Sequence, residues 1–291
     1  MMALKIFFNG KFVSEEDAKI SVFDHGVLYG DGVFEGIRSY KRKVFRLDEH
    51  LDRLYSSAEV IRLKIPITKD AFRSRILETL TMNDLDDAYV RAVVTRGPGD
   101  LGLDPRKCPS PTIFIIADKI ALYPEALYKK GMPITIAKTR RNHPSAMNPR
   151  VKSLNYLNNI FGKIDAIDAG TEEALMLSVE GYIVECTGDN IFFVKDGVLM
   201  TPPCDIGSLE GITQKAVMGL ARKRGIEAKF AKIKPEEIPT MDECFLTGTA
   251  AEIIPVIKID DKTVGLGSPG SVTKQLLQDY KELIKKEGTA Y

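Results

Sequence analysis

Lys152 is the side chain of this sequence whose surroundings best suit covalent chemistry. Behind it, apolar residues recur at helical spacing: Leu157, Ile160, Phe161, Ile164 and Ile167. Ser153 is a candidate cap, so the lysine is expected at the mouth of a helix. The positive end of the helix dipole and removal from water both favour a neutral amine, which is the form that attacks an aldehyde. The alternative is an ordinary solvated lysine.

An aldehyde cofactor with a phosphate group also needs an anion-binding site. Gly211-Ile212-Thr213 opens a predicted helix that ends near Arg224, and backbone N–H groups at a helix start bind phosphate. Gly248-Thr249-Ala250-Ala251 is a second small-residue turn that an anion could approach closely. Arg53, on a predicted helix, adds a cation. Alternatively, each glycine motif is an ordinary turn that binds no anion, and Arg53 forms an ordinary surface salt bridge.

Glu185 is a candidate for controlling the ring of such a cofactor. It ends the predicted strand Tyr182–Glu185 and runs into the polar turn Thr187-Gly188-Asp189-Asn190. A carboxylate in that place could keep a pyridine nitrogen protonated, and a pyridinium accepts the electrons released when a Cα–H bond breaks. A glutamate that faces solvent at a strand end fits the local pattern equally well.

The bulk composition argues for a globular protein with a small ligand. The chain has 291 residues, 44% of them hydrophobic, which is enough for one large core or two ordinary domains. A net charge of +1 gives no electrostatic reason to expect nucleic acid or an anionic membrane. The longest apolar runs, such as Ile113 to Ala117, are too short to span a bilayer, and Met1 to Val13 does not read as a signal peptide. We expect a cytoplasmic protein.

Metal sites and disulfides are not expected. The cysteines form no CxxC pair, and the histidines form no HExxH motif. These residues are Cys108, Cys186, Cys204 and Cys244, and His25, His50 and His143.

The first part of the chain predicts an α+β unit that closes near residue 119. Asn9-Gly10 lies between apolar residues and indicates a hairpin over Leu4 to Val13. Two amphipathic helices follow, at 46–63 and 68–81, and then strands at 89–95 and 112–117. We assign 1–119 to a small domain and 120–131 to a connection.

The remaining residues, 132–291, predict a larger domain that contains Lys152. Its expected elements are strands at 134–138, 174–201 and 243–264 and helices at 212–224 and 272–286, besides the helix after Lys152. Turns are expected at Glu180-Gly181 and Asp196-Gly197.

Several motifs occur together and in order, and they carry a family resemblance. They are Phe34-Glu35-Gly36-Ile37-Arg38, Tyr89-Val90-Arg91, Lys152-Ser153-Leu154-Asn155-Tyr156, Glu185 with Gly188-Asp189-Asn190, Gly211-Ile212-Thr213, and Gly248-Thr249-Ala250-Ala251-Glu252. Nearly the whole chain resembles the branched-chain amino acid aminotransferases of the fold-type IV pyridoxal-phosphate enzymes. The resemblance implies two α/β domains with the cofactor site between them.

The resemblance also implies roles for the cofactor-binding residues. Lys152 would be the Schiff-base lysine, Glu185 the partner of the pyridine nitrogen, and Tyr156 a donor to the phenolic oxygen of pyridoxal 5′-phosphate. Leu209 would be a further cofactor-binding residue, and the phosphate would be held by Arg53, Ile212, Thr213 and Thr249.

On the substrate side, spacing by two places Phe34, Gly36 and Arg38 on one strand face, and it does the same for Tyr89 and Arg91. In the family those faces line the substrate. Phe34, Tyr29 and Tyr156 would wall an apolar pocket, and Arg91 with Tyr29 would meet the distal carboxylate of glutamate or 2-oxoglutarate. Backbone amides near Ala250 and Ala251 would take the α-carboxylate.

The implied activity is transamination between leucine, isoleucine or valine and 2-oxoglutarate. Ser153-Leu154 replaces a glycine-rich stretch of many relatives and is also found in D-amino acid aminotransferases, which therefore stay an alternative, as do other fold-type IV transaminases. Against the D-specific enzymes, Thr95-Arg96-Gly97 is followed directly by Pro98-Gly99-Asp100-Leu101-Gly102 and not by an Arg-x-His. A scaffold without activity is the remaining alternative. The family implies a homodimer or larger assembly in which the 98–104 loop reaches the neighbouring site.

Overall fold

The structure is a computed structural model that describes residues 4–120 and 123–291. Contacts between residues divide the chain into two compact units. The first comprises Met1–Ala121, Val151–Asn155 and Ile284–Tyr291, and the second comprises Leu122–Arg150 and Tyr156–Leu283. Residues 121 and 122 of the expected connection lie outside the described residues. The rest of that connection contains a short helix, α4 (Glu125–Lys130).

The first unit is an antiparallel sheet with helices, in the strand order β16-β4-β3-β5-β6-β1-β2. Its strands are β1 (Lys5–Phe8), β2 (Lys11–Ser14), β3 (Gly32–Tyr40), β4 (Lys43–Val44), β5 (Ala88–Thr95), β6 (Thr112–Asp118) and β16 (Thr289–Ala290). Its helices are α1 (His25–Tyr29), α2 (Leu47–Val60) and α3 (Lys69–Met82), with 3-10 turns at Glu15–Asp17 and Pro105–Lys107.

The hairpin expected at the start of the chain is confirmed. Asn9 and Gly10 join β1 to β2, and both have a positive φ, 46° and 90°. That conformation matches a type I′ turn, whose twist suits the flanking strands and which Asn-Gly adopts at little cost. The two long helices are confirmed as well, and the hydroxyl of Thr68 caps α3 by accepting from the N–H of Ala71.

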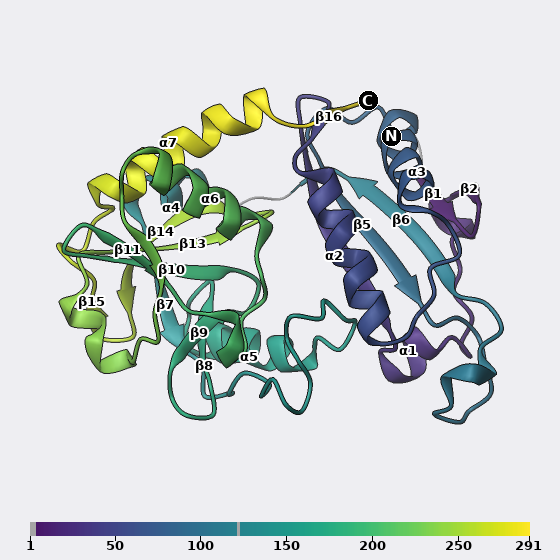
Figure 1. Ribbon diagram of the computed structural model, residues 1–291, viewed down its shortest axis with the longest axis horizontal. Coiled ribbons are helices and arrows are strands. Elements are labelled where there is room, and N and C mark those ends of the chain that lie inside the picture. The colour runs from purple at the N-terminus through teal and green to yellow at the C-terminus, as the bar shows by residue number, and fades with distance from the viewer. Residues whose placement is uncertain (1–3, 121–122) are drawn as a thin grey trace. The chain divides into compact units, whose positions relative to one another are not determined.

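One face of this sheet is covered by α2 and α3 (Figure 1). Side chains alternate along a strand, so Val33 and Ile37 of β3 point into this core with Val90 and Ile115. The alternate residues Phe34, Gly36 and Arg38 therefore share the opposite face.

Arg96, for which the sequence suggested no role, joins the start of β3 to the end of α2. Its Nε and Nη2 donate to the two carboxylate oxygens of Asp31, each at 2.9 Å. The same guanidinium donates to the carbonyls of Ile61 and Arg62, 2.7 and 2.8 Å away. Carbonyls at a helix C-terminus lack partners within the helix, so Arg96 stabilises that end of α2.

The short segment Val151–Asn155 packs with the first unit because its backbone extends the edge of β3. The N–H of Phe34 donates to the carbonyl of Lys152 at 3.1 Å, and the N–H of Leu154 donates to that of Gly32 at 2.9 Å. Lys152, which we expected in the second domain, thus lies in the first unit.

The second unit contains a mixed sheet in the order β12-β11-β10-β13-β14-β7-β8-β9, with β15 beside β14. Its strands are β7 (Met132–Ile136), β8 (Ala174–Leu177), β9 (Ile183–Cys186), β10 (Asn190–Lys195), β11 (Val198–Thr201), β12 (Ala228–Phe230), β13 (Glu243–Gly248), β14 (Glu252–Ile259) and β15 (Lys262–Thr263). Besides α4, its helices are α5 (Leu157–Asp168), α6 (Ile212–Lys223) and α7 (Ser271–Lys286), which lies in this unit up to Leu283; 3-10 turns span Cys204–Ile206 and Pro235–Thr240.

The helix after Lys152 differs from the expectation in two ways. It begins at Leu157, with Tyr156 at the N-cap position and no side-chain cap, so the expectation that Ser153 caps it was wrong. Its apolar stripe is exposed, whereas Asn159, Gly162 and Ala166 are its buried residues. The exposed residues are Leu157, Ile160, Phe161, Ile164 and Ile167. The apolar period located the helix correctly, but small residues on the other side form its buried face.

No helix within residues 4–120 and 123–291 has the length and apolar character needed to cross a membrane.

Candidate active site

Lys152 lies against the face of β3 that carries Phe34. Its Nζ is 4.7 Å from the centre of the Phe34 ring. The backbone of Lys152 is held on both sides, because its N–H donates to Ser57 Oγ of α2 at 3.2 Å and its carbonyl accepts from Phe34. The half-buried amine is therefore placed by a strand and a helix although it belongs to neither.

The residues expected on the substrate side do share one face of the β3–β5 pair. In the register of these strands, Gly36 is opposite Arg91 and Arg38 is opposite Tyr89. The guanidinium of Arg91 stacks over Phe34, 4.6 Å from the ring centre, and its Nη2 donates to Tyr89 Oη at 3.2 Å. An arginine braced in this way can bind a carboxylate without first losing much side-chain freedom.

Glycine is needed at position 36 because of Tyr89. A Cβ added to Gly36 would lie 2.0 Å from Tyr89 Oη, far inside van der Waals contact. The missing side chain lets the Tyr89 hydroxyl cross the strand and reach Arg91.

Arg53 is neither a solvated cation nor part of a surface salt bridge. Its Nε and Nη2 donate to the two oxygens of Glu35, at 2.7 and 2.9 Å, and Glu35 is completely buried. His50, one turn earlier on α2, places Nδ1 2.7 Å from Glu35 Oε2. Sequence reasoning missed Glu35 and His50. The signal was available for Glu35, since a charged residue between Phe34 and Gly36 must point to the helix-covered face.

Tyr29, at the end of α1, contacts the loop 98–104 of its own chain. Its hydroxyl donates to the carbonyl of Leu101 at 2.5 Å, and His25 Nε2 lies 2.8 Å from the carbonyl of Asp100. Asp24 caps α1 and is itself held by the hydroxyls of Thr95 and Thr112. Helix α1 thus positions both Tyr29 and the loop.

In the second unit, Glu185 is a buried carboxylate with several donors. Its Oε1 lies 2.8 Å from Arg141 Nη2, and its Oε2 accepts from Asn190 Nδ2 at 3.2 Å and from the N–H of Leu209 at 2.9 Å. Glu185 is therefore not the solvent-facing residue of the alternative interpretation. Charge-assisted bonds on both oxygens hold the carboxylate in one orientation. Arg141, which sequence reasoning missed, has no local motif that would have revealed it.

The first expected anion site is the start of α6. Gly211 is the N-cap residue, and Ile212 and Thr213 are the first helical residues, both buried. A Cβ on Gly211 would lie 1.9 Å from Asn190 Oδ1. Leu209 leads into this turn, and its carbonyl accepts from Asn190 Nδ2 at 2.9 Å. Asn190 therefore links the Glu185 carboxylate to the helix start.

The second expected anion site is the tight turn between β13 and β14. Gly248 pairs with Glu252 across the two strands, so residues 249–251 form the connection. A Cβ at Gly248 would lie 1.8 Å from Asp189 Oδ1, and the carbonyl of Ala251 accepts from Tyr128 Oη at 3.1 Å. Thr249 and Ala250 lie at the tip.

Of the remaining expected residues, Tyr156 belongs to the second unit and is half-buried at the start of α5, and Arg38 lies over the Tyr40 ring, 4.4 Å from its centre. The expected residues of the first unit, except Tyr29, thus gather around β3, β5 and α2. Those of the second unit other than Tyr156 gather at two turns and the strand end next to Glu185.

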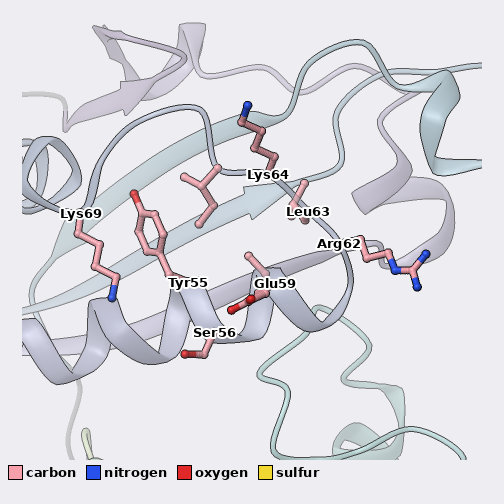
Figure 2. Close-up of a pocket in the computed structure, with 9 residues that line it drawn as sticks. Tyr55, Ser56, Glu59, Arg62, Leu63, Lys64 and Lys69 are labelled. Atoms are coloured by element: carbon pink, nitrogen blue, oxygen red, sulfur yellow. The ribbon is translucent and has the colours of Figure 1, made fainter.

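A separate groove of about 580 Å³ lies along the last turns of α2. Tyr55, Leu63 and Ile65 supply its apolar lining. Figure 2 shows that the nitrogens of Arg62, Lys64 and Lys69 point in three different directions, and Lys69 is already paired with Asp52 at 2.6 Å. The groove lacks the convergent polar groups that mark a specific small-molecule site.

Comparison with known proteins identifies the family of this chain. Residues 32–259 match the model of the family described as amino-transferase class IV. The chain belongs to the class IV aminotransferases. This class IV aminotransferase is 52% identical over 285 residues to a putative branched-chain-amino-acid aminotransferase of Methanocaldococcus jannaschii, and the match covers 98% of each chain.

Solved structures agree with the fold of the class IV aminotransferase. The branched-chain amino acid aminotransferase of Escherichia coli superposes with a TM-score of 0.94 at 36% identity, over 97% of this chain and 95% of that one. The branched-chain amino acid aminotransferase of Thermoproteus uzoniensis, with norvaline, superposes with a TM-score of 0.92 at 37% identity, over 98% and 96%. A third such enzyme, complexed with N-(5′-phosphopyridoxyl)-L-glutamate, superposes with a TM-score of 0.91 at 36% identity, over 98% and 95%. The expected fold-type IV architecture is confirmed.

Proposed function

We propose that this protein is a pyridoxal-phosphate-dependent aminotransferase that exchanges the amino group between branched-chain L-amino acids and 2-oxoglutarate. The observation that carries the proposal is the 52% identity over 285 residues with a protein named as a putative branched-chain-amino-acid aminotransferase. The phosphopyridoxyl-glutamate complex of a structural neighbour supports both the cofactor and glutamate as one substrate.

The residues present fit this cofactor. At both proposed phosphate turns, only a glycine leaves room for the neighbouring polar side chain, Asp189 or Asn190. Thr247 Oγ1, next to the Gly248 turn, is buried and has no hydrogen-bond partner among the described residues. A buried hydroxyl without a partner costs free energy, so a polar ligand at this turn would stabilise it.

In this proposal Lys152 holds the cofactor covalently and Glu185 bonds its pyridine nitrogen. Tyr156 donates to its phenolic oxygen, and Leu209 is a further cofactor-binding residue. The phosphate is bound by Arg53, Ile212, Thr213 and Thr249. When bound, this cofactor supplies an aldehyde carbon for the amino group and a ring that accepts the electrons of the Cα–H bond.

The chain's own groups then move the proton. The incoming amino group would first displace Lys152 from the cofactor, and the released Nζ would then take the proton from the substrate Cα and return it at the cofactor's C4′, acting as base and then as acid. The Phe34 ring beside Nζ excludes water from one side of the amine. The anchored Glu185 carboxylate stabilises a protonated ring nitrogen throughout.

We further propose that one pocket accepts both substrates. Phe34, Tyr29 and Tyr156 form its apolar wall, and Arg91, held by Phe34 and Tyr89, binds the distal carboxylate of glutamate. Gly36 and Arg38 line the same strand face, and the amides near Ala250 and Ala251 bind the α-carboxylate. An arginine stacked on an aromatic ring suits both substrates. The aromatic ring can contact an apolar side chain, and the charged edge of the guanidinium can bind a carboxylate.

Borohydride labelling tests the cofactor assignment. Reduction of the holoprotein followed by peptide mass spectrometry should place the phosphopyridoxyl group on Lys152. Lys163, on the neighbouring helix α5, is the internal control and should stay unlabelled. A label on any lysine other than Lys152 would refute the assignment. Initial rates with L-leucine, D-alanine and an aromatic amine should be highest with L-leucine, and preference for either other donor would select a different transaminase.

We propose a homodimer or larger assembly in which the 98–104 loop reaches the neighbouring site. Support comes from exposed apolar side chains on α1 and the loop, including Val27, Leu101 and Leu103, which are 56, 68 and 80% exposed. Light scattering should show an assembly for the native protein and dissociation, with loss of activity, for Leu101→Asp/Leu103→Asp. A fully active native monomer would reject the proposal.

The cytoplasm is the compartment we propose, because the cysteines at 108, 186, 204 and 244 are all free thiols, as is usual in reducing compartments. Cell fractionation tests this.

A further inference from the structure

Helix α2 carries a polar stripe along its buried side. His50, Arg53 and Ser57 are three and four residues apart, so they lie one above the other on one face of the helix. His50 and Ser57 are buried within an otherwise apolar surface. Polar groups in such a place need partners, and each of them has one. Ser57 bonds the backbone of Lys152, and His50 and Arg53 both bond Glu35.

The Glu35 carboxylate is held by three bonds. Oε1 accepts from Arg53 Nε, and Oε2 accepts from both Arg53 Nη2 and His50 Nδ1. Burial raises the pKa of Glu35, but the charge and hydrogen bonds of Arg53, helped by His50, outweigh burial and lower that pKa to about 2. An ionised carboxylate only accepts, so Nδ1 of His50 must carry a proton and donate it. Burial lowers the pKa of His50, and the charges of Arg53 and Lys152 lower it further against the opposing effect of Glu35.

These bonds set the direction of the Arg53 guanidinium. Two nitrogens along one edge of the planar group are fixed on a buried carboxylate, so the plane in which all its N–H groups lie is fixed too. His50 in turn keeps the carboxylate from rotating. A donor that is oriented before its ligand arrives loses less conformational entropy on binding.

We propose that Glu35 and His50 are positioning residues that orient Arg53 toward a phosphate group. The inference rests on the proposed function, in which Arg53 binds the phosphate of the cofactor. Neither residue contacts the phosphate; both act through Arg53. Glu35 also lies between Phe34 and Gly36 on β3, and Phe34 bonds the backbone of Lys152. One strand thus positions the amine and the phosphate-binding cation.

A pair of ligands that differ only in phosphate tests the proposal. Apoprotein is titrated with pyridoxal 5′-phosphate and with pyridoxal, and the ratio of the two dissociation constants measures what the phosphate contributes. Glu35→Gln and Arg53→Ala should each weaken binding of the phosphorylated ligand by about tenfold or more and leave pyridoxal within about twofold, as for other residues that orient a ligand-binding group. The double variant should be no worse than Arg53→Ala alone, because Glu35 acts through Arg53.

His50 provides a matched pair of variants that does not depend on the folding of Glu35→Gln. His50→Gln keeps an N–H donor for Glu35 and should retain most of the phosphate preference, whereas His50→Phe should reduce it. Ile76→Val, a core change in α3 outside the network, should lower the melting temperature of the apoprotein without changing the preference.

Some results would overturn the proposal. If folded Glu35→Gln or His50→Phe bound pyridoxal 5′-phosphate and pyridoxal more weakly by the same factor, the role of these residues would be structural only. The same conclusion would follow if the double variant weakened binding of pyridoxal 5′-phosphate by the product of the factors measured for Glu35→Gln and Arg53→Ala alone. Failure of the proposed function is distinguishable, because the unaltered apoprotein would then bind pyridoxal 5′-phosphate no better than it binds pyridoxal, before any variant is made.

Discussion

Arg141 and Glu185 form a buried ion pair, with Arg141 Nη2 and Glu185 Oε1 2.8 Å apart and both side chains less than a tenth exposed. Arg141 also donates to the carbonyl of Gly207 and to Asn159 Oδ1, at 3.2 and 2.8 Å. The carboxylate proposed to bond the cofactor ring is therefore fixed by a cation that is itself fixed by α5 and the turn before α6.

Replacing Arg141 with methionine should leave Glu185 as a buried charge without its cation. We expect the free energy of unfolding of the apoprotein to fall by about 3 kcal/mol, the usual cost of breaking a buried pair from one side. Urea unfolding measures this. Arg150→Met is the matched control, because Arg150 and Glu210 form an exposed pair at 3.8 Å and its loss should cost at most about 1 kcal/mol. Equal losses in the two variants would contradict the role of burial.

Replacing Arg91 with alanine should harm the reaction of glutamate more than that of leucine. Leucine has no distal carboxylate, so it loses only the apolar contact of the arginine stem. We expect the rate constant with glutamate to fall by about tenfold more, the equivalent of one charge-assisted hydrogen bond of about 1.4 kcal/mol. Single-turnover measurements with each donor would show it. Arg75→Ala is the control, because it breaks only a partly exposed pair with Glu78 and should change neither reaction. If Arg91→Ala lowered the rate constants with glutamate and with leucine by the same factor, the specificity role of Arg91 would be rejected.

Gly36→Ala should damage activity more than stability. The new Cβ would displace the Tyr89 hydroxyl, which is the end of a side chain and can move, so we expect less than about 1.5 kcal/mol of destabilisation. Arg91 would lose its bond to Tyr89, and kcat/KM should fall for glutamate. The double variant Gly36→Ala/Tyr89→Phe should recover part of the lost stability, because the hydroxyl that meets the new Cβ is gone. Its kcat/KM for glutamate should stay low, because the bond to Arg91 is still missing. Gly219→Ala in α6, where no atom lies within 4 Å of the new Cβ, should stabilise the protein by up to about 1 kcal/mol. Normal activity in Gly36→Ala would count against Tyr89 as a brace.

The hydrogen bonds of Glu35 with Arg53 and His50 should stabilise the folded protein while Glu35 is ionised, and they should stabilise it less as the pH falls. The pKa of Glu35 is lowered from 4.5 to about 2 in the folded protein by Arg53 and His50 against the opposing effect of burial. A carboxyl whose pKa is lower when folded stabilises the protein fully above its unfolded pKa, and that contribution is lost as the pH falls toward 2. The stability difference between native protein and Glu35→Gln should therefore shrink between pH 4.5 and 2.

Urea unfolding of both proteins at several pH values measures that difference. The exposed Glu16→Gln variant should stay within about 0.5 kcal/mol of the native protein at every pH. A gap for Glu35→Gln that does not vary with pH would disprove the linkage.

Local pattern was sufficient for most secondary structure. The Asn9-Gly10 hairpin and the helices α2, α3 and α6 were located by turn chemistry and a period of 3.6 residues, both of which act within a few neighbours along the chain. Strand alternation alone also placed Phe34, Gly36 and Arg38 on one face, as the register with β5 confirms. The start of α5 was misjudged because the residues before it extend β3, a pairing between positions more than a hundred residues apart.

Residue types and short-range spacing were enough to predict the class of chemistry, the order of the main elements and the strand face on which Phe34, Gly36 and Arg38 lie. Which charged side chains pair with one another became clear only from the packing of the folded chain. Glu35 with Arg53 and His50, and Arg141 with Glu185, are partners from different elements, and no spacing along the chain encodes them. The same holds for α5, where the structure decided that small residues, and not the apolar stripe, face inward. Such pairings follow from how whole elements pack, since burial selects the partner that satisfies each charge.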